Sequence, residues 1–178
     1  MIAIMQDTFL SVFDGATERQ FDEGERVFLT GAPIRNVYFV RRGCAVLERP
    51  LAHGDTAYLQ RAVSGDVVAE ASVYAKSYHC DCTALQPTVL AVLPREVFRQ
   101  ALRDDAEMAE TWAAHLARTV QRTRMRAEIR SLKTVADRLD AWLAEYGPLP
   151  EKGLWQGVAH ELSVSREALY RELARRRD

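Results

Sequence analysis

The residues with the clearest potential for chemistry lie in the last quarter of the sequence, around two short helical patterns. The first pattern has one apolar face at i, i+3, i+4 and i+7, formed by Trp155, Val158, Ala159 and Leu162. Ser165 is a good N-cap for the second pattern, whose apolar face carries Leu169 and Leu173. Two helices around a tight turn are typical of a helix-turn-helix, whose second helix enters the major groove of DNA, with an ordinary helical hairpin as the alternative.

A second group with possible chemistry is the run His79-Cys80-Asp81-Cys82. Strand alternation places Cys80 and Cys82 on one face and His79 and Asp81 on the other, so the four side chains cannot easily bind one metal ion. The two cysteine Cβ atoms are expected about 6–7 Å apart, which is too far for an unstrained disulfide. We therefore expect no metal site and interpret the cysteines as small apolar core residues, with a thiol- or metal-responsive site as the alternative.

No catalytic constellation is present in the sequence. A nucleophile elbow, a P-loop and an HExxH motif are all absent, and the four histidines share no common spacing. We therefore predict that the protein is not an enzyme and has no catalytic residues.

The elements that must position these residues change in character along the chain. From Arg19 to about Leu93, short β-branched and aromatic runs alternate with glycines, which favours an all-β sandwich or barrel. Beyond Pro94 the period becomes helical, and Asp104 and Asp105 open a long helix that continues to about Arg130, on the order of 40 Å. A further helix ends at the breaker run 147–150, before the helix-turn-helix.

The long helix carries a narrow stripe that predicts pairing with its copy across a dimer axis. The predicted interface residues are Met108, Trp112, His115, Leu116, Thr119 and Val120. The alternative is that this helix packs on its own barrel.

Composition and charge narrow the class of protein. The chain has 178 residues, 48% hydrophobic and 28% charged, which suits one large or two small soluble domains. It has no apolar run of membrane-spanning length and no signal peptide pattern, so we expect a cytoplasmic protein. Residues 1–114 carry 11 Lys/Arg against 16 Asp/Glu, and residues 115–178 carry 13 against 9. This asymmetry fits nucleic-acid binding by the C-terminal part, although a solvated basic face is the alternative.

The order and spacing of these features resemble the CRP/FNR superfamily of bacterial transcription regulators over nearly the whole chain. Residues 21–31 and 37–43 are similar to the family's strand-turn pattern, and residues 65–72 stand where its phosphate-binding cassette begins. Residues 165–171 are similar to the start of its recognition helix.

The resemblance implies an α+β fold. It consists of an N-terminal antiparallel, jelly-roll-like β-roll of the cyclic-nucleotide-binding type (1–103), a long dimerisation helix (104–130) and a C-terminal helix-turn-helix domain (131–178). It also implies a homodimer on a palindromic operator in double-stranded DNA, with two recognition helices in successive major grooves about 34 Å apart. RNA polymerase is a further expected partner, and a membrane is not.

The matching positions imply roles in DNA recognition. Arg166 and Arg171 would donate to guanine O6 and N7, and Glu167 would accept from a cytosine amino group. Ser165 would cap the helix and contact a phosphate, and Arg175 would attract phosphate without recognising sequence. The full predicted set is Ser165, Arg166, Glu167, Tyr170, Arg171 and Arg175.

The same resemblance locates a candidate effector pocket. Cyclic-nucleotide-binding members hold the ribose with a glutamate and the cyclic phosphate with an arginine; Glu70 matches the glutamate, but residues 76–84 contain no arginine. Lys76 lies in this run and offers a point charge in place of a planar fork. The candidate pocket residues are Glu70, Ala71, Ser72, Tyr78 and His79. We therefore expect no cofactor, disfavour cAMP, and predict a pocket that is altered, empty or tuned to another effector.

Two departures from the family pattern shape the expectations. Ser163 stands in the turn where the family commonly has glycine, and serine reaches the left-handed conformation only at some cost. The sequence stops at Asp178, so we expect a truncated or missing β-hairpin wing. The main alternative function is a ligand-sensing or protein-interaction module without specific DNA binding.

Overall fold

The strands of the first half form two packed antiparallel sheets. The computed structural model describes residues 11–50 and 56–176. The first residues of the predicted 1–103 domain and the chain end at Asp178 lie outside the described residues.

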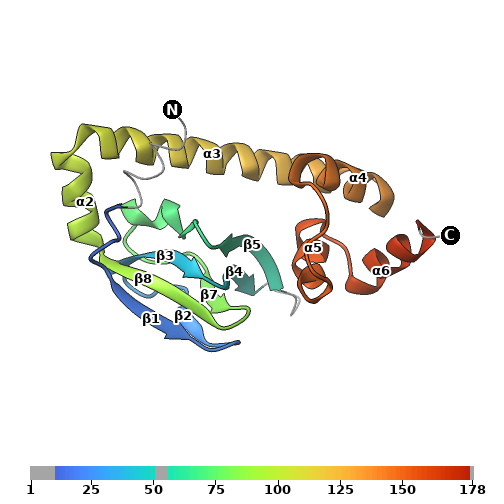
Figure 1. The fold of residues 1–178 in the computed structure, drawn as a ribbon, viewed down its shortest axis with the longest axis horizontal. Coiled ribbons are helices and arrows are strands. Elements are labelled where there is room, and N and C mark those ends of the chain that lie inside the picture. Colours follow the sequence, from blue (N-terminus) through green and yellow to red (C-terminus); the bar gives the residue numbers. More distant parts are fainter. Residues whose placement is uncertain (1–10, 51–55, 177–178) are drawn as a thin grey trace. The chain divides into compact units, whose positions relative to one another are not determined.

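One sheet has the strand order β1-β8-β3-β6 and the other β2-β7-β4-β5. Every strand pair is antiparallel, as Figure 1 shows for β1, β8 and β3. The strands are β1 (Thr17–Phe21), β2 (Arg26–Phe28), β3 (Asn36–Arg42), β4 (Cys44–Pro50), β5 (Thr56–Val63), β6 (Val67–Val68), β7 (Asp81–Ala84) and β8 (Thr88–Pro94). A short 3₁₀ helix, η1 (Glu70–Tyr74), lies between β6 and β7. The predicted antiparallel roll is confirmed.

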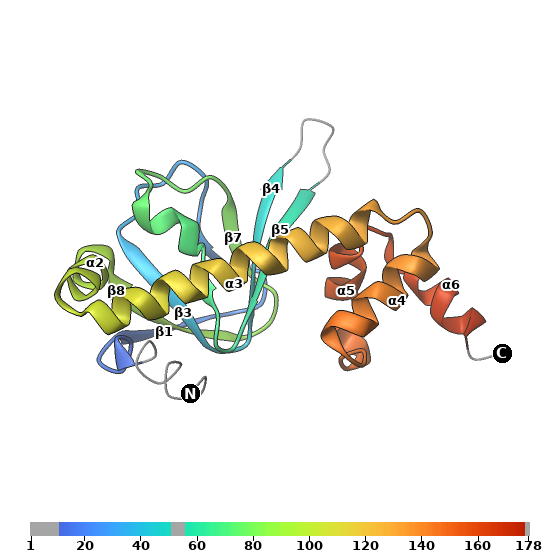
Figure 2. The ribbon, with the colours of Figure 1, turned by 90° about the horizontal axis from the view of Figure 1, so that it is seen from above.

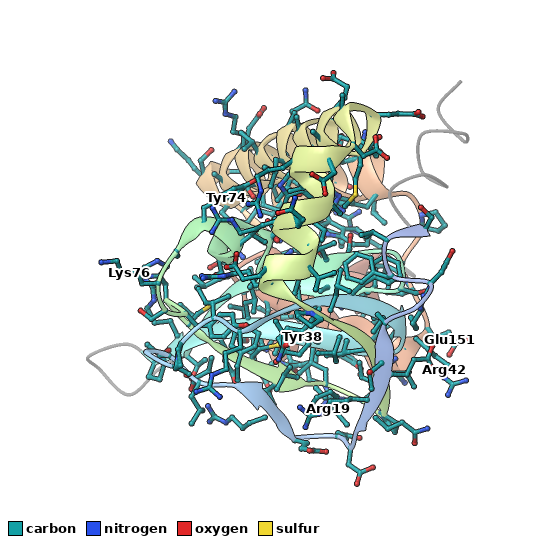
Figure 3. The ribbon with its side chains drawn as sticks, turned by 90° about the vertical axis from the view of Figure 1, so that its left-hand side faces the viewer. Arg19, Tyr38, Arg42, Tyr74, Lys76 and Glu151 are labelled. Atoms are coloured by element: carbon teal, nitrogen blue, oxygen red, sulfur yellow. The ribbon has the colours of Figure 1, made fainter. Side chains whose placement is uncertain are left out.

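Side chains from both sheets fill the interior of the roll. The Phe28 and Tyr78 rings stack with centroids 3.7 Å apart, and the Phe28 ring lies 5.8 Å from Tyr38. Cys80 and Cys82 belong to the same buried cluster. In Figure 3, Tyr38 lies within the roll, whereas Tyr74 and Lys76 project from its surface.

A second cluster covers the other face of the β3–β8 sheet. It joins side chains of that sheet to α2 (Arg95–Asp104) and to the start of α3 (Ala106–Ser131). The Phe98 and Trp112 rings meet edge to face, with 4.9 Å between their centroids. Asp105 begins α3 by accepting hydrogen bonds from the backbone N–H groups of Glu107 and Met108, which fits its predicted place at the helix N-terminus.

The C-terminal helices share a core of their own. They are the end of α3, α4 (Val135–Tyr146), the short 3₁₀ helix η2 (Lys152–Leu154), α5 (Trp155–Glu161) and α6 (Arg166–Arg175). Ile129, Leu139, Leu162 and Leu169 are almost fully buried there. The predicted break follows α4, where Gly147 has a φ of 82° and donates to the Leu143 carbonyl.

Internal contacts divide the chain into two compact units, Met1–Leu116 and Ala117–Asp178. Helix α3 is one continuous helix, drawn from yellow to orange in Figure 2, and supplies core residues to each unit. Antiparallel sheets followed by helices match the predicted α+β class. Among residues 11–50 and 56–176, no helix is long and apolar enough to span a bilayer.

Gly43 provides a stability test of the roll. An added Cβ would lie 2.6 Å from the Pro87 carbonyl oxygen and 2.6 Å from Thr88 Oγ1. We predict that the clash in Gly43→Ala lowers the free energy of unfolding by about 1–3 kcal/mol. This loss adds to about 1–2 kcal/mol for placing an alanine at the positive φ of Gly43. Gly31→Ala is the control, because Gly31 has a φ of 82° and an added Cβ there would have no atom within 4 Å beyond its chain neighbours. Equal losses in urea unfolding would contradict the predicted clash.

Candidate nucleic-acid interface and ligand pocket

Helix α6 begins at a well-formed cap. Ser165 has extended backbone angles, and its hydroxyl accepts a hydrogen bond of 3.1 Å from the Ala168 N–H, as the sequence predicts for an N-cap. Leu169 is fully buried, so the opposite face of α6 is exposed. The predicted helix pair is present: α5 and α6 lie on either side of a four-residue turn.

The turn between the two helices requires a left-handed residue. Ser163 occupies it with a φ of 55°. Its N–H donates to the His160 carbonyl, and the Val164 N–H donates to the Ala159 carbonyl, which together form a Schellman motif. Serine therefore adopts the conformation for which glycine is usual, at a cost of about 1–2 kcal/mol.

The N-terminal part of α6 presents charged groups to solvent. Arg166, Glu167 and Arg171 are exposed. The Arg166 guanidinium lies over the Tyr170 ring at 5.2 Å from its centroid, and the Trp155 ring lies 5.2 Å from the same ring. This aromatic contact restrains Arg166 while leaving its donors accessible.

The carboxylate of Glu167 is readily ionised. Hydrogen bonds from its own backbone N–H and from the Ser165 hydroxyl lower the pKa of Glu167, and the nearby Arg166 and Arg171 charges act in the same direction. A carboxylate at this place can only accept hydrogen bonds, which suits an amino-group partner.

The C-terminal part of α6 is internally neutralised. Arg175 donates two hydrogen bonds to Glu172, and Arg176 donates to Glu172 and to Asp140 of α4. Hydrogen bonds from both arginines lower the pKa of Glu172 to about 2. Arg175, which the sequence suggests as a phosphate contact, therefore already has an acidic partner. Arg166 lies at the start of α6 and Arg171 near its middle.

The candidate effector residues do not form one cluster. Glu70 and Ser72 are buried in η1 and Tyr78 is buried in the roll, but Ala71 and His79 are exposed. The Glu70 carboxylate accepts a hydrogen bond of 3.0 Å from the Gln60 side chain.

The Arg49 guanidinium reaches the backbone of residues 76–84 from a neighbouring strand. Arg49 of β4 donates its Nε–H to the His79 carbonyl at 3.1 Å. No local pattern in the sequence predicts this contact or the contact of Gln60 with Glu70, because Arg49 and Gln60 come from other strands.

The thiols and the acidic residue between them lie on opposite faces, as alternation predicts. Cys80 and Cys82 are buried inside the roll. Asp81 faces the other way, where it pairs with Arg26 and accepts a hydrogen bond from the Thr30 N–H at 2.7 Å. That backbone bond is the main cause of the lowered pKa of Asp81, although partial burial opposes it. Within the described part of the chain, His, Cys, Asp and Glu side chains do not gather in threes as a metal site would require.

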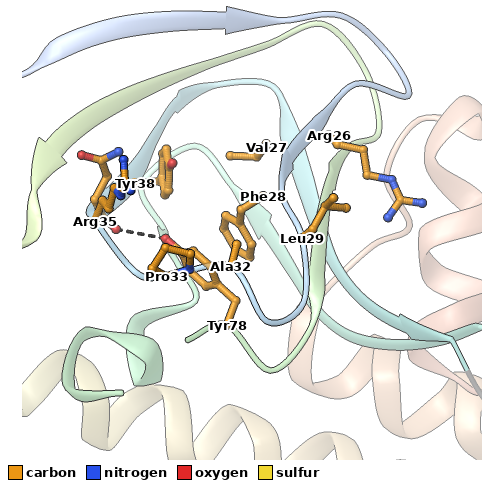
Figure 4. A pocket seen from close by; sticks show the side chains of 10 residues that line it. Arg26, Val27, Phe28, Leu29, Ala32, Pro33, Arg35, Tyr38 and Tyr78 are labelled. Atoms are coloured by element: carbon orange, nitrogen blue, oxygen red, sulfur yellow. Dashed lines mark hydrogen bonds between the residues drawn. The ribbon is translucent and has the colours of Figure 1, made fainter. Parts of the chain in front are cut away.

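A pocket of about 400 Å³ opens at the β2–β3 side of the roll. Figure 4 shows its aromatic side, where the Tyr78 hydroxyl donates to the Asn36 carbonyl at 3.2 Å. Only Tyr78 of the five candidate effector residues lines it. The Phe28 and Tyr78 rings in its lining are stacked on one another, and Arg26 is paired with Asp81.

The predicted dimer residues divide into two sets along α3. Met108, Trp112 and His115 are buried in the first unit, and Leu116 packs against the same cluster. For these residues the structure favours the alternative interpretation, packing on the chain's own roll. Thr119 is half-buried and Val120 is 48% exposed, so both remain accessible to a partner helix.

Comparison with known proteins finds a family that matches the β-roll. The sequence matches the cyclic nucleotide-binding domain family over residues 18–105, from β1 to the end of α2. The global nitrogen regulator of Synechococcus elongatus is 24% identical over 160 residues, covering 84% of this chain and 69% of that protein.

Solved structures extend the likeness beyond this cyclic nucleotide-binding domain. FixK2 from Bradyrhizobium japonicum superimposes with a TM-score of 0.76 at 20% identity, covering 90% of this chain and 83% of FixK2. The c-di-GMP responsive global regulator CLP of Xanthomonas campestris has a TM-score of 0.71 at 19% identity, covering 98% of this chain and 91% of CLP. The predicted resemblance to the CRP/FNR superfamily is confirmed. At these identities, the solved structures show only that this chain has the same fold.

The buried cysteines of the cyclic nucleotide-binding domain give a direct test of the thiol hypothesis. Burial raises the pKa of Cys80 and of Cys82, and a thiol whose pKa lies one unit higher holds about tenfold less reactive thiolate. We predict that a thiol reagent at pH 8 labels Cys44, Cys80 and Cys82 only as fast as the protein unfolds. Rapid labelling of any one cysteine in the folded protein would support a thiol sensor instead.

Proposed function

We propose that the chain is a dimeric, sequence-specific DNA-binding transcription regulator of the CRP/FNR type. In this proposal, residues 1–103 form the sensor domain, 104–130 the dimerisation helix and 131–178 the DNA-binding domain. Support comes from the fold likeness to FixK2 and CLP, and from the global nitrogen regulator among the relatives.

The observation that carries the proposal is the exposed start of α6. It combines a serine N-cap with two arginines and a glutamate at i, i+1 and i+5 of the following helix, all exposed beside a fully buried Leu169. A planar guanidinium can donate two hydrogen bonds to guanine, and an ionised carboxylate can accept one from cytosine. An ordinary helical hairpin would not require these three groups at the solvent-facing start of its second helix.

A dimer would determine the symmetry of the DNA site and the spacing of its half-sites. Ala113, Ala117 and Val120 are exposed at i, i+4 and i+7 of α3, and their small or compact side chains permit close approach of a second helix. Together with Thr119 they replace the buried residues as the proposed dimer contact. A two-fold dimer calls for a palindromic operator with half-sites about 34 Å apart, and RNA polymerase is its expected partner at a promoter.

We propose that the effector of this regulator is not cAMP. The Glu70 carboxylate is already bonded to Gln60, and Cys80 is a buried apolar residue in a segment that lacks an arginine. An anionic phosphate there would have to be desolvated without a planar pair of donors. Arg49 comes from a neighbouring strand, but it is exposed and its Nε is bonded to the His79 carbonyl.

Substitutions at the start of α6 test recognition. We predict that Arg166→Ala and Arg171→Ala each weaken binding to a selected operator by about 1–3 kcal/mol and relax sequence preference. Arg175→Ala is the control, because Arg175 is paired with Glu172 and should change affinity little. Fluorescence anisotropy on operator and scrambled duplexes over a range of salt separates the effects. Equal losses on both duplexes would mean phosphate contacts only.

Calorimetry tests the sensor. We predict no measurable heat when cAMP or cGMP is titrated into the full chain at concentrations up to about 100 μM, where a site of micromolar affinity would saturate. Gln60→Ala, which removes one hydrogen-bond partner of the Glu70 carboxylate, should not create binding, because the phosphate donors are still missing. Saturable binding of either nucleotide to the unmodified protein would contradict this part of the proposal.

A further inference from the structure

The last backbone carbonyls of α5 are satisfied by arginines from two other helices. Arg130, in the last turn of α3, donates from Nε to the Glu161 carbonyl at 3.0 Å and from Nη2 to the His160 carbonyl at 3.2 Å. Arg138 of α4 donates from Nη1 to the carbonyls of Leu162 and Ser163 at 3.1 and 3.2 Å.

These hydrogen bonds supply partners for carbonyls that have none within a helix at its C-terminal end. The final four carbonyls of a helix lack intrahelical partners and form the negative end of its dipole. Here the Schellman motif uses the carbonyls of Ala159 and His160, and the two guanidinium groups bond the carbonyls of residues 160 to 163. Burial lowers the pKa of Arg130, and two backbone carbonyls accept hydrogen bonds from its guanidinium.

These arginines bond to the turn between α5 and α6, which contains a residue with a strained backbone conformation. Ser163 has a φ of 55°, a conformation that an L residue with a Cβ adopts at a cost. The Ser163 carbonyl, which the strained residue itself carries, accepts from Arg138. Two residues later Ser165 caps α6, so the angle of the turn sets the direction in which α6 leaves it.

Arg138 also connects the turn to the start of its own helix. Its Nε donates to the Leu132 carbonyl at 2.8 Å, in the connection between α3 and α4. One guanidinium thus links this connection to the turn before α6. A lysine has a single nitrogen on a flexible stem and cannot span these acceptors in the same fixed geometry.

We propose that Arg138, assisted by Arg130, is a positioning residue that holds the left-handed turn at Ser163 and thereby fixes the orientation of α6 for DNA recognition. The DNA part of this inference rests on the proposed function. If the arginine is needed because the turn contains serine, then a glycine at 163 makes the arginine largely dispensable.

A double-mutant cycle on the full chain tests this dependence. The variants are Arg138→Gln, Ser163→Gly and the two together, with Arg138→Lys as the conservative variant. Lys133→Gln is the charge-matched control, because Lys133 is an exposed cation in the same unit. The readout is the ratio of affinities for a selected operator and a scrambled duplex.

We expect Arg138→Gln to lower this ratio about tenfold, and Ser163→Gly to restore most of it in the double variant. Arg138→Lys should lie between Arg138→Gln and the unmodified protein, and Lys133→Gln should leave the ratio unchanged. A loss that is the same with serine and with glycine at position 163 would overturn the proposal. So would an equal loss in Lys133→Gln.

A second readout separates this inference from the proposed function. In the DNA-free protein, amide hydrogen exchange at Ser163 and Val164 should become about tenfold faster in Arg138→Gln and return toward its original rate in the double variant. Unchanged exchange in Arg138→Gln would refute the holding role, whatever the protein does with DNA. Loss of operator preference in the unmodified protein, with the exchange pattern as expected, would refute only the DNA function. Arg130→Gln provides the same comparison if Arg138→Gln does not fold.

Discussion

The turn between α5 and α6 is the constraint on which the arrangement of these two helices depends. The four-residue turn contains one residue in the left-handed region, and Ser163 adopts that conformation without the freedom of glycine. The resulting cost is offset locally, because the Schellman hydrogen bonds and the donors of Arg130 and Arg138 satisfy the exposed carbonyls. The direction of α6, and therefore the position of its charged side chains, follows from this one turn.

Local ion pairing matters more than net charge for the proposed interface. Residues 115–178 have an excess of basic residues, which suggests general attraction to phosphate. In the structure, Glu172 and Asp140 bind the arginines at the end of α6, and backbone carbonyls bind Arg130 and Arg138. Much of the basic excess therefore has a structural role. The exposed start of α6 is left as the part of the helix with the chemistry for recognising bases.

Much of this fold could be predicted from the sequence, because its signals are local. Glycine spacing, the cap at Ser165 and the apolar period of α5 and α6 each depend on a few neighbouring residues. The alternation that separates Cys80 and Cys82 from Asp81 is equally local, and it correctly predicts buried thiols.

The remaining contacts join residues distant in sequence and leave no periodic signal. Gln60 and Glu70 come from different elements, as do Arg138 and the turn that it holds. The stripe on α3 was ambiguous for a related reason: Met108 and Trp112 look alike whether they face a partner helix or the chain's own roll. Only the position of α2 and the β3–β8 sheet shows which surface buries them.

Selection of binding sites from a random duplex library by the purified full chain tests the central claim most directly. The account predicts enrichment of a palindromic motif whose half-sites are centred about one helical turn of DNA apart, in the absence of any cyclic nucleotide. A lack of enrichment over unselected DNA, or enrichment without two-fold symmetry, would contradict it.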